Sequence, residues 1–184
     1  NEESRLPQTL ERVAAYAASK SFSTEVLVVD DGSRDGTAAA AARAGEKWPA
    51  LRLLRNPGNR GKGFSVRHGM LHAAGQIILF SDADLSAPIE EADRLLDALE
   101  AGHDVAIGSR GLRPELIEVH QSSLRESAGK TFNLLVRAIT GLPFRDTQCG
   151  FKAFRREAAR AIFRRQQIDG FGFDVEVLYL ARKL

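Results

Sequence analysis

The sequence predicts an α/β domain built on a mostly parallel β-sheet that is flanked by helices. Short apolar runs rich in β-branched residues alternate with longer stretches in which apolar residues recur at helical spacing. Clusters of aspartate, serine and glycine directly follow several of the apolar runs. Strands that alternate with helices are typical of a parallel sheet, and polar clusters at the strand ends are typical of its ligand site.

The elements of the first half alternate regularly. Leu6, Leu10 and Val13 recur at helical spacing and predict a helix over roughly 4–19. Asp35-Gly36-Thr37 is a turn that opens a second helix, and Pro88 with two acids after it opens another. The predicted strands are Val26–Val29, Leu51–Leu54, Ile77–Phe80 and Val105–Ile107, and the helices between them cover 35–46, 63–74 and the stretch from 88.

Beyond residue 112 the alternation loosens. We expect a helix near 123–140, a strand near 150–154, a helix near 156–166 and a final helix from about residue 174. Between Arg145 and Arg165 lie seven basic and two acidic residues. This cluster is either a solvated helix face or a surface for anionic lipid head groups or a phosphorylated acceptor.

Composition narrows the possible functions. The 184 residues suffice for one domain with its own core, and 43% hydrophobic with 27% charged residues argue against disorder. A net charge of +2 gives no reason to expect a nucleic-acid partner. The single cysteine, Cys149, excludes a disulfide framework and a cysteine-based zinc site, and we expect it to be structural. The longest uncharged run, 68–81, is too short and polar to span a bilayer.

Three predicted strands end in polar clusters that we expect to share one cleft. They are followed by Asp30-Asp31-Gly32-Ser33, by Ser81-Asp82-Ala83-Asp84 and by Gly108-Ser109-Arg110. Strand alternation would place the side chains of Asp82 and Asp84 on the same side. Two such carboxylates repel unless a cation lies between them or one is protonated, and hard oxygen ligands indicate Mg²⁺ or Mn²⁺. The alternative is a capped loop that leads into the next helix.

Other motifs bear on nucleotide binding. The basic, glycine-rich segment 59–63 suits an approach to phosphate oxygens, but its spacing is not that of a Walker loop. No GxGxxG follows the first strand, so dehydrogenase and P-loop hypotheses lose support. A carboxylate at Asp30 or Asp31 can accept the N–H of a uracil or the amino group of another base. His68 and His72 have a zinc-like spacing, but without an HExxH glutamate we expect a polar helix face.

Six segments together resemble one enzyme family. VVDDGSRDGT, NRGKGFSVRHGM, SDADLSAP, GSR, DTQCGFKAF and GFGFDVEVLYLA occur in the order seen in inverting family 2 glycosyltransferases, and the last two resemble dolichyl-phosphate β-glucosyltransferases. The resemblance covers residues 1–184 and implies the nucleotide-sugar-binding, Rossmann-like fold of A-type glycosyltransferases. Asn1-Glu2-Glu3 is similar to the end of the family's Pro-x-Tyr-Asn-Glu motif, so the family's first strand is missing. We expect one catalytic domain over 1–184, truncated at both ends.

The resemblance also implies roles for single residues. The implied nucleotide-sugar contacts are Glu2, Asp30, Asp31, Lys62, Asp82, Ala83 and Asp84. The implied metal ligands are Asp82 and Asp84, of which Asp84 is the first choice. The implied catalytic residues are Asp84, Asp174 and Arg110, and the candidate cations at the acceptor phosphate are Arg110, Arg125 and Lys152. Asp174 would serve as base, acceptor positioner or helix N-cap.

The implied reaction transfers a hexose to a polyprenyl or dolichyl monophosphate with inversion of the anomeric carbon. The resemblance favours glucose as the hexose and UDP-glucose as its donor, with Mg²⁺ or Mn²⁺ as cofactor. A phosphate acceptor with a second pKa of about 6 is ionised at neutral pH and attacks without a strong base. The full-length protein would work at the cytoplasmic side of a membrane. Two alternatives stay open: a family 2 transferase with a sugar hydroxyl acceptor and Asp174 as base, and a non-catalytic nucleotide-sugar-binding module.

Overall fold

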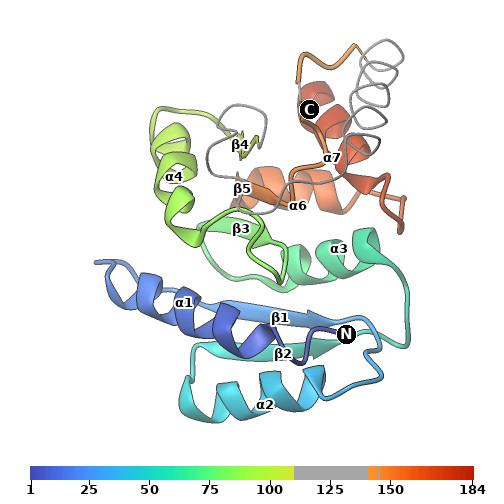
Figure 1. The fold of residues 1–184 in the computed structure, drawn as a ribbon. Helices are drawn as coiled ribbons and strands as arrows, with labels where there is room; N and C mark the ends of the chain where they lie inside the picture. Colours follow the sequence, from blue (N-terminus) through green and yellow to red (C-terminus); the bar gives the residue numbers. More distant parts are fainter. Residues whose placement is uncertain (110–140, 145) are drawn as a thin grey trace, which may run out of the picture.

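The strands form one parallel pair and one three-stranded antiparallel sheet. In a computed structural model of the protein, residues 1–109, 141–144 and 146–184 are described. Strand β1 (Val26–Asp30) pairs in parallel with β2 (Leu51–Arg55). Strand β5 (Phe151–Arg155) lies between β3 (Ile77–Ser81) and β4 (Val105–Ile107) and is antiparallel to both. Figure 1 shows the β1–β2 pair below and the three-stranded sheet above.

Helices cover these strands on both sides. The prediction of an α/β fold with flanking helices is confirmed, and β3 and β4 share a direction because both oppose β5. Near the β1–β2 pair lie α1 and α2, as Figure 1 shows. The helix bounds are α1 Leu6–Ala18, α2 Thr37–Lys47, α3 Lys62–His72, α4 Ala92–Glu100, α6 Arg156–Phe163 and α7 Phe173–Lys183.

The core has apolar clusters on both faces of the three-stranded sheet. On one face Phe80 and Phe154 pack against α3, α6 and α7, where the rings of Phe80 and Phe173 lie 5.9 Å apart. On the other face Ala153 and its neighbours pack against Leu99 of α4. Because strand side chains alternate, the three-stranded sheet is packed on both faces.

A third cluster joins α1 and α2 to β2. It is formed by Leu6, Leu10, Ala41 and Leu51, all buried. The helical periodicity that predicted α1 therefore marks a real buried face.

Element boundaries differ modestly from the sequence predictions. The helix start expected at Pro88 is a single 3₁₀ turn, Ile89–Glu91, which leads into α4. The helix expected to reach residue 166 ends at Phe163, and the Gln166 side chain instead hydrogen-bonds to the carbonyl of Gly63. The helix predicted near 123–140 lies outside the described residues. No helix in the described ranges is both long and apolar enough to cross a bilayer.

Candidate functional site

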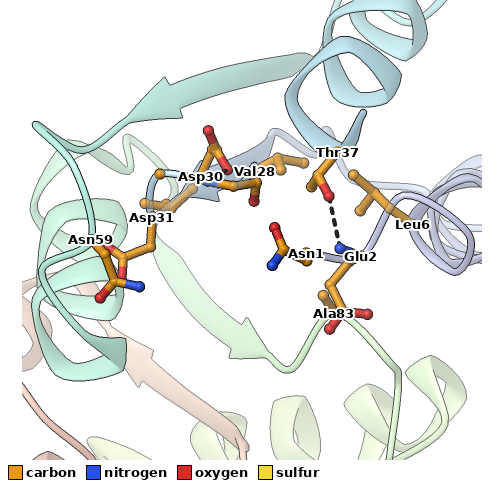
Figure 2. Close-up of a pocket in the computed structure, with 12 residues that line it drawn as sticks. Asn1, Glu2, Leu6, Val28, Asp30, Asp31, Thr37, Asn59 and Ala83 are labelled. Carbon is orange, nitrogen blue, oxygen red and sulfur yellow. Dashed lines mark hydrogen bonds between the residues drawn. The ribbon is translucent and has the colours of Figure 1, made fainter. Parts of the chain in front are cut away.

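A hollow of about 240 Å³ lies at the carboxyl end of β1. Figure 2 shows Asp31 and Asn59 on one side of it and Glu2 and Ala83 on the other. Its lining comprises Asn1, Glu2, Leu6, Val28, Val29, Asp30, Asp31, Gly32, Ser33, Thr37, Asn59 and Ala83. Because Ala83 follows β3, the end of that strand borders the same hollow as the end of β1. Of the described residues expected at a shared cleft, Lys62, Asp82, Asp84 and the end of β4 at Gly108-Ser109 are not part of this lining.

The two aspartates at the end of β1 make different hydrogen bonds. Asp30 is 7% exposed and accepts a bond of 3.1 Å from the amide of Ser33. The carboxylate of Asp31 accepts from the side-chain amide of Asn56 and from the backbone amides of 60–61, each at 2.8 Å. Burial alone would raise the pKa of Asp31, but these hydrogen bonds outweigh it and lower the pKa. Asp31 is thus an anion that fastens the basic segment 59–63 to β1.

The first residues of the chain fold over the start of α2. The amide of Glu2 donates to the hydroxyl of Thr37 at 2.7 Å, and the amide of Gly36 donates to the Glu3 carboxylate at 2.8 Å. Asp35 accepts from the amide of Thr37 at 3.1 Å, as the predicted turn requires. These bonds place Glu2 at the wall of the hollow.

The segment after β3 turns at once. Strand β3 ends at Ser81, and the amide of Leu85 donates to the carbonyl of Asp82 at 3.1 Å. Asp82 and Asp84 therefore lie in a turn and not in an extended strand, so strand alternation does not apply to them. Asp84 accepts from the amide of Ser86 at 3.1 Å, and Leu85 has a φ of +48°. A non-glycine residue in this region is strained, as is common at functional sites.

Asp82 is held between two segments. Its carboxylate lies 2.7 Å from the ammonium of Lys62, at the start of α3. Its amide donates to the carbonyl of Gly150 at 3.0 Å, and a Cβ at position 150 would overlap the Asp82 carboxylate. Both Asp82 and Lys62 remain partly exposed, at 29% and 27% of their side chains. The pair is therefore accessible to a ligand.

The donor set near this turn consists of carboxylates. Within the described ranges, no three side chains of the His, Cys, Asp or Glu type gather as a metal cluster. Two carboxylates after one strand suit Mg²⁺ or Mn²⁺ when substrate phosphates and water complete the coordination, because Mg²⁺ in particular is usually bound by one or two carboxylates with phosphates.

A second ion pair lies deeper. Lys152 of β5 and Asp174 in the first turn of α7 approach to 2.5 Å, with side chains 0% and 4% exposed. Lys152 also donates to the carbonyl of Cys149 at 2.6 Å. Burial raises the pKa of Asp174, and the ammonium of Lys152 opposes that rise. The N-cap of α7 is Gly172, so the helix-cap role considered for Asp174 is not realised.

The remaining candidates fall in different places. Arg110 and Arg125 lie outside the described residues. His68 contacts the Asn56 side chain at 2.7 Å, and His72 contacts the carbonyl of His68 at 2.8 Å, as expected of a polar helix face.

Two features of the site were missed at the level of sequence. Asn56, only 7% exposed, links Asp31 to α3 through the hydroxyl of Ser65. The pairing of Lys152 with Asp174 was also missed. The sequence did contain a signal for this pairing, because Lys152 lies among phenylalanines in an apolar strand and a buried lysine needs a charged partner.

An α/β domain with acidic strand ends at a hollow beside an Asp-x-Asp turn agrees with the fold expected of A-type glycosyltransferases. The chain is similar in fold to glucosyl-3-phosphoglycerate synthase from Mycobacterium tuberculosis in complex with Mn²⁺, UDP-glucose and phosphoglyceric acid. The TM-score is 0.70 at 19% identity, over 97% of this chain and 60% of that one. Mannosyl-3-phosphoglycerate synthase from Rubrobacter xylanophilus gives a TM-score of 0.65 at 24% identity, over 88% and 52%.

The chain belongs to glycosyl transferase family 2, whose sequence profile matches residues 1–163. It is 40% identical over 197 residues to the dolichyl-phosphate beta-glucosyltransferase of Drosophila melanogaster, covering 100% of this chain and 60% of that protein. The human protein of the same name is 34% identical over 195 residues, covering 99% and 60%. The chain thus spans about 60% of the length of these relatives.

Proposed function

We propose that this chain is the nucleotide-sugar-binding, catalytic part of a polyprenyl-phosphate β-glucosyltransferase. The donor is UDP-glucose, the acceptor is dolichyl or another polyprenyl monophosphate, and the anomeric carbon is inverted. Relatives of this name at 34–40% identity support the acceptor class. The acidic hollow at the end of β1 supports a base that carries N–H donors, such as uracil.

One observation carries the choice of acceptor. A hydroxyl acceptor must lose a proton during transfer and needs a general base. Asp174, the carboxylate proposed for that task, has a side chain 4% exposed and is bound at 2.5 Å by Lys152. A phosphate monoester is already ionised at neutral pH, so it attacks without such a base. The buried pair therefore favours a phosphate acceptor.

In the proposed reaction, the bond from the anomeric carbon to the donor diphosphate breaks and a bond to an oxygen of the acceptor phosphate forms on the opposite face. The leaving nucleoside diphosphate takes the electron pair, and no proton has to move. The task of the protein is to align the two phosphates and to balance their charge.

The side chains have distinct proposed tasks. Asp82 and Asp84 would hold Mg²⁺ or Mn²⁺, which when bound neutralises charge on the leaving diphosphate. Lys62 would add a second positive charge there. Asp30 and Asp31 would accept hydrogen bonds from the base, and Glu2 would close the wall of the hollow beside them. Solved relatives that contain Mn²⁺ support the metal.

The acceptor side has fewer described residues. Arg110 and Arg125 remain the proposed cations for the acceptor phosphate. The pairing of Lys152 with Asp174 favours a role for Lys152 in holding the site together. A lipid acceptor and a sequence with a single cysteine favour work at the cytoplasmic face of a membrane.

The test is transfer of labelled glucose from UDP-glucose to dolichyl phosphate in vesicles, with Mn²⁺. We expect a labelled, organic-soluble glucolipid that is absent with EDTA and that forms roughly a hundredfold more slowly with Asp84→Ala. Activity of Asp84→Ala equal to that of the wild type would remove the metal site. Transfer only to a sugar or other hydroxyl acceptor, with lipid phosphate inert, would overturn the proposed acceptor.

Transfer to a hydroxyl acceptor is the second candidate function. The observation in its favour is the raised pKa of Asp174, caused by burial, since a carboxyl with a raised pKa is a better proton acceptor. The variant Asp174→Asn separates the two, because it abolishes a general base but leaves an ionised phosphate able to attack.

A further inference from the structure

The loop between α6 and α7 lies against the first turn of α3. The amide of Phe64 donates to the carbonyl of Asp169 at 3.1 Å. Gln166, 4% exposed, donates from its side chain to the carbonyl of Gly63 at 3.0 Å. A Cβ at position 63 would overlap the carbonyl of Ile168, so glycine is required for this close approach. The loop and the start of α3 are therefore in direct backbone contact.

Two charged side chains brace this loop from opposite sides. The two carboxylate oxygens of Glu176, in the first turn of α7, accept from the amides of Gln167 and Ile168 at 2.9 and 2.8 Å. From α3, Arg67 donates to the carbonyl of Gln166 at 2.9 Å and to the carboxylate of Asp169 at 2.7 Å. Residues 166–169 are thus bonded to both helices, so a displacement of the start of α7 would also displace the loop that contacts α3.

The first turn of α3 carries a residue of the candidate site. Helix α3 begins at Lys62, whose ammonium lies 2.7 Å from Asp82. On its other side, the amide of Gly61 is bound to Asp31 at 2.8 Å. The backbone at Lys62 is therefore held between Asp31 and the 166–169 loop. A shift of that loop would move the ammonium away from Asp82.

We propose that Glu176 is a positioning residue for the donor diphosphate: by bracing the 166–169 loop against α3, it holds the ammonium of Lys62 beside Asp82. The proposal rests on the proposed function, in that the ligand at Asp82 is a nucleotide sugar. Glu176 itself touches only the backbone of the loop, so it acts through Lys62. The bidentate geometry requires a carboxylate, and a glutamine keeps only one of the two accepting oxygens.

Calorimetry of UDP-glucose in the presence of Mn²⁺ tests this coupling. Lys62→Met should weaken binding about tenfold, because a charge-assisted bond is lost. Glu176→Ala should weaken binding roughly fivefold, with Glu176→Gln between Glu176→Ala and the wild type. The double variant should bind like Lys62→Met alone, since Glu176 acts through Lys62. The control Glu11→Ala, at an exposed position of α1, should bind like the wild type.

A ligand-free measurement separates this proposal from the proposed function. Acetylation of Lys62 by a water-soluble ester, followed by mass spectrometry, should be roughly threefold faster in Glu176→Ala than in the wild type, because a released ammonium loses its partner. The exposed Lys47 serves as the internal reference. Equal Lys62 rates, or additive effects on binding, would overturn the positioning role. Faster acetylation of Lys62 with no binding of UDP-glucose to the wild type would uphold the positioning role and overturn the proposed donor.

Discussion

Breaking the buried pair of Lys152 and Asp174 should lower the free energy of unfolding strongly and the turnover of the folded protein only weakly. Their side chains are 0% and 4% exposed, so removing one partner leaves a buried charge. Such a loss costs about 3–5 kcal/mol, whereas replacing both partners by apolar groups is often neutral. For a chain of this size, Lys152→Met or Asp174→Asn should lower the melting temperature by roughly 6–20 °C. The double variant Lys152→Met/Asp174→Leu should recover most of that loss.

Thermal and urea unfolding of the wild type, the two single variants and the double variant measure the losses and the recovery, and transfer assays well below each midpoint measure turnover. Because the acceptor phosphate needs no base, the turnover of folded Asp174→Asn should stay within about tenfold of the wild type. The reasoning is refuted if Asp174→Asn melts like the wild type while its turnover falls by about 10³, which is the signature of a lost general base.

Three further predictions concern the acidic ends of the strands. The pKa of Asp31 is lowered below 3.8, so its ionised carboxylate stabilises the fold above that pH, and this stabilisation is lost as the pH falls. The urea midpoints of the wild type and of Asp31→Asn should therefore differ near neutral pH and converge in strong acid. The methyl group of Gly150→Ala should collide with the carboxylate of Asp82, lower the free energy of unfolding in urea by about 1–3 kcal/mol and weaken Mn²⁺-dependent binding of UDP-glucose. In the control Gly170→Ala the added Cβ meets open space, so stability and binding should both stay as in the wild type. Asp84→Ala should lower turnover by roughly a hundredfold with little change in melting temperature, because the described Asp84 contact is a single bond to the amide of Ser86; a large fall in melting temperature would show a structural role instead.

Periodicity and turn chemistry predicted most of the elements. The apolar runs marked all five described strands, and the helical spacing of Leu6 and Leu10 marked α1. These signals are local, because burial of one face dictates the spacing. The direction of β5 was not predictable, since an apolar run has the same composition in a parallel and in an antiparallel strand.

The candidate site was predictable where it rests on strand ends. Asp30 and Ala83 border one hollow, as the polar clusters at the strand ends predicted, although β1 and β3 pair with different strands. The premise that Asp82 and Asp84 continue the strand was wrong, because β3 ends at Ser81 and the chain turns over residues 82–85. Contacts between residues far apart in the sequence, such as Arg67 with Asp169, depend on tertiary packing and leave no local pattern.

The most direct measurement is a diffraction experiment on crystals grown with UDP and Mn²⁺, with data collected at the manganese edge. We predict an anomalous peak within coordination distance of the Asp84 carboxylate, diphosphate oxygens completing its shell, and uracil in the hollow beside Asp30. Nucleotide bound elsewhere on the domain, or manganese with no contact to Asp82 or Asp84, would contradict the proposed site.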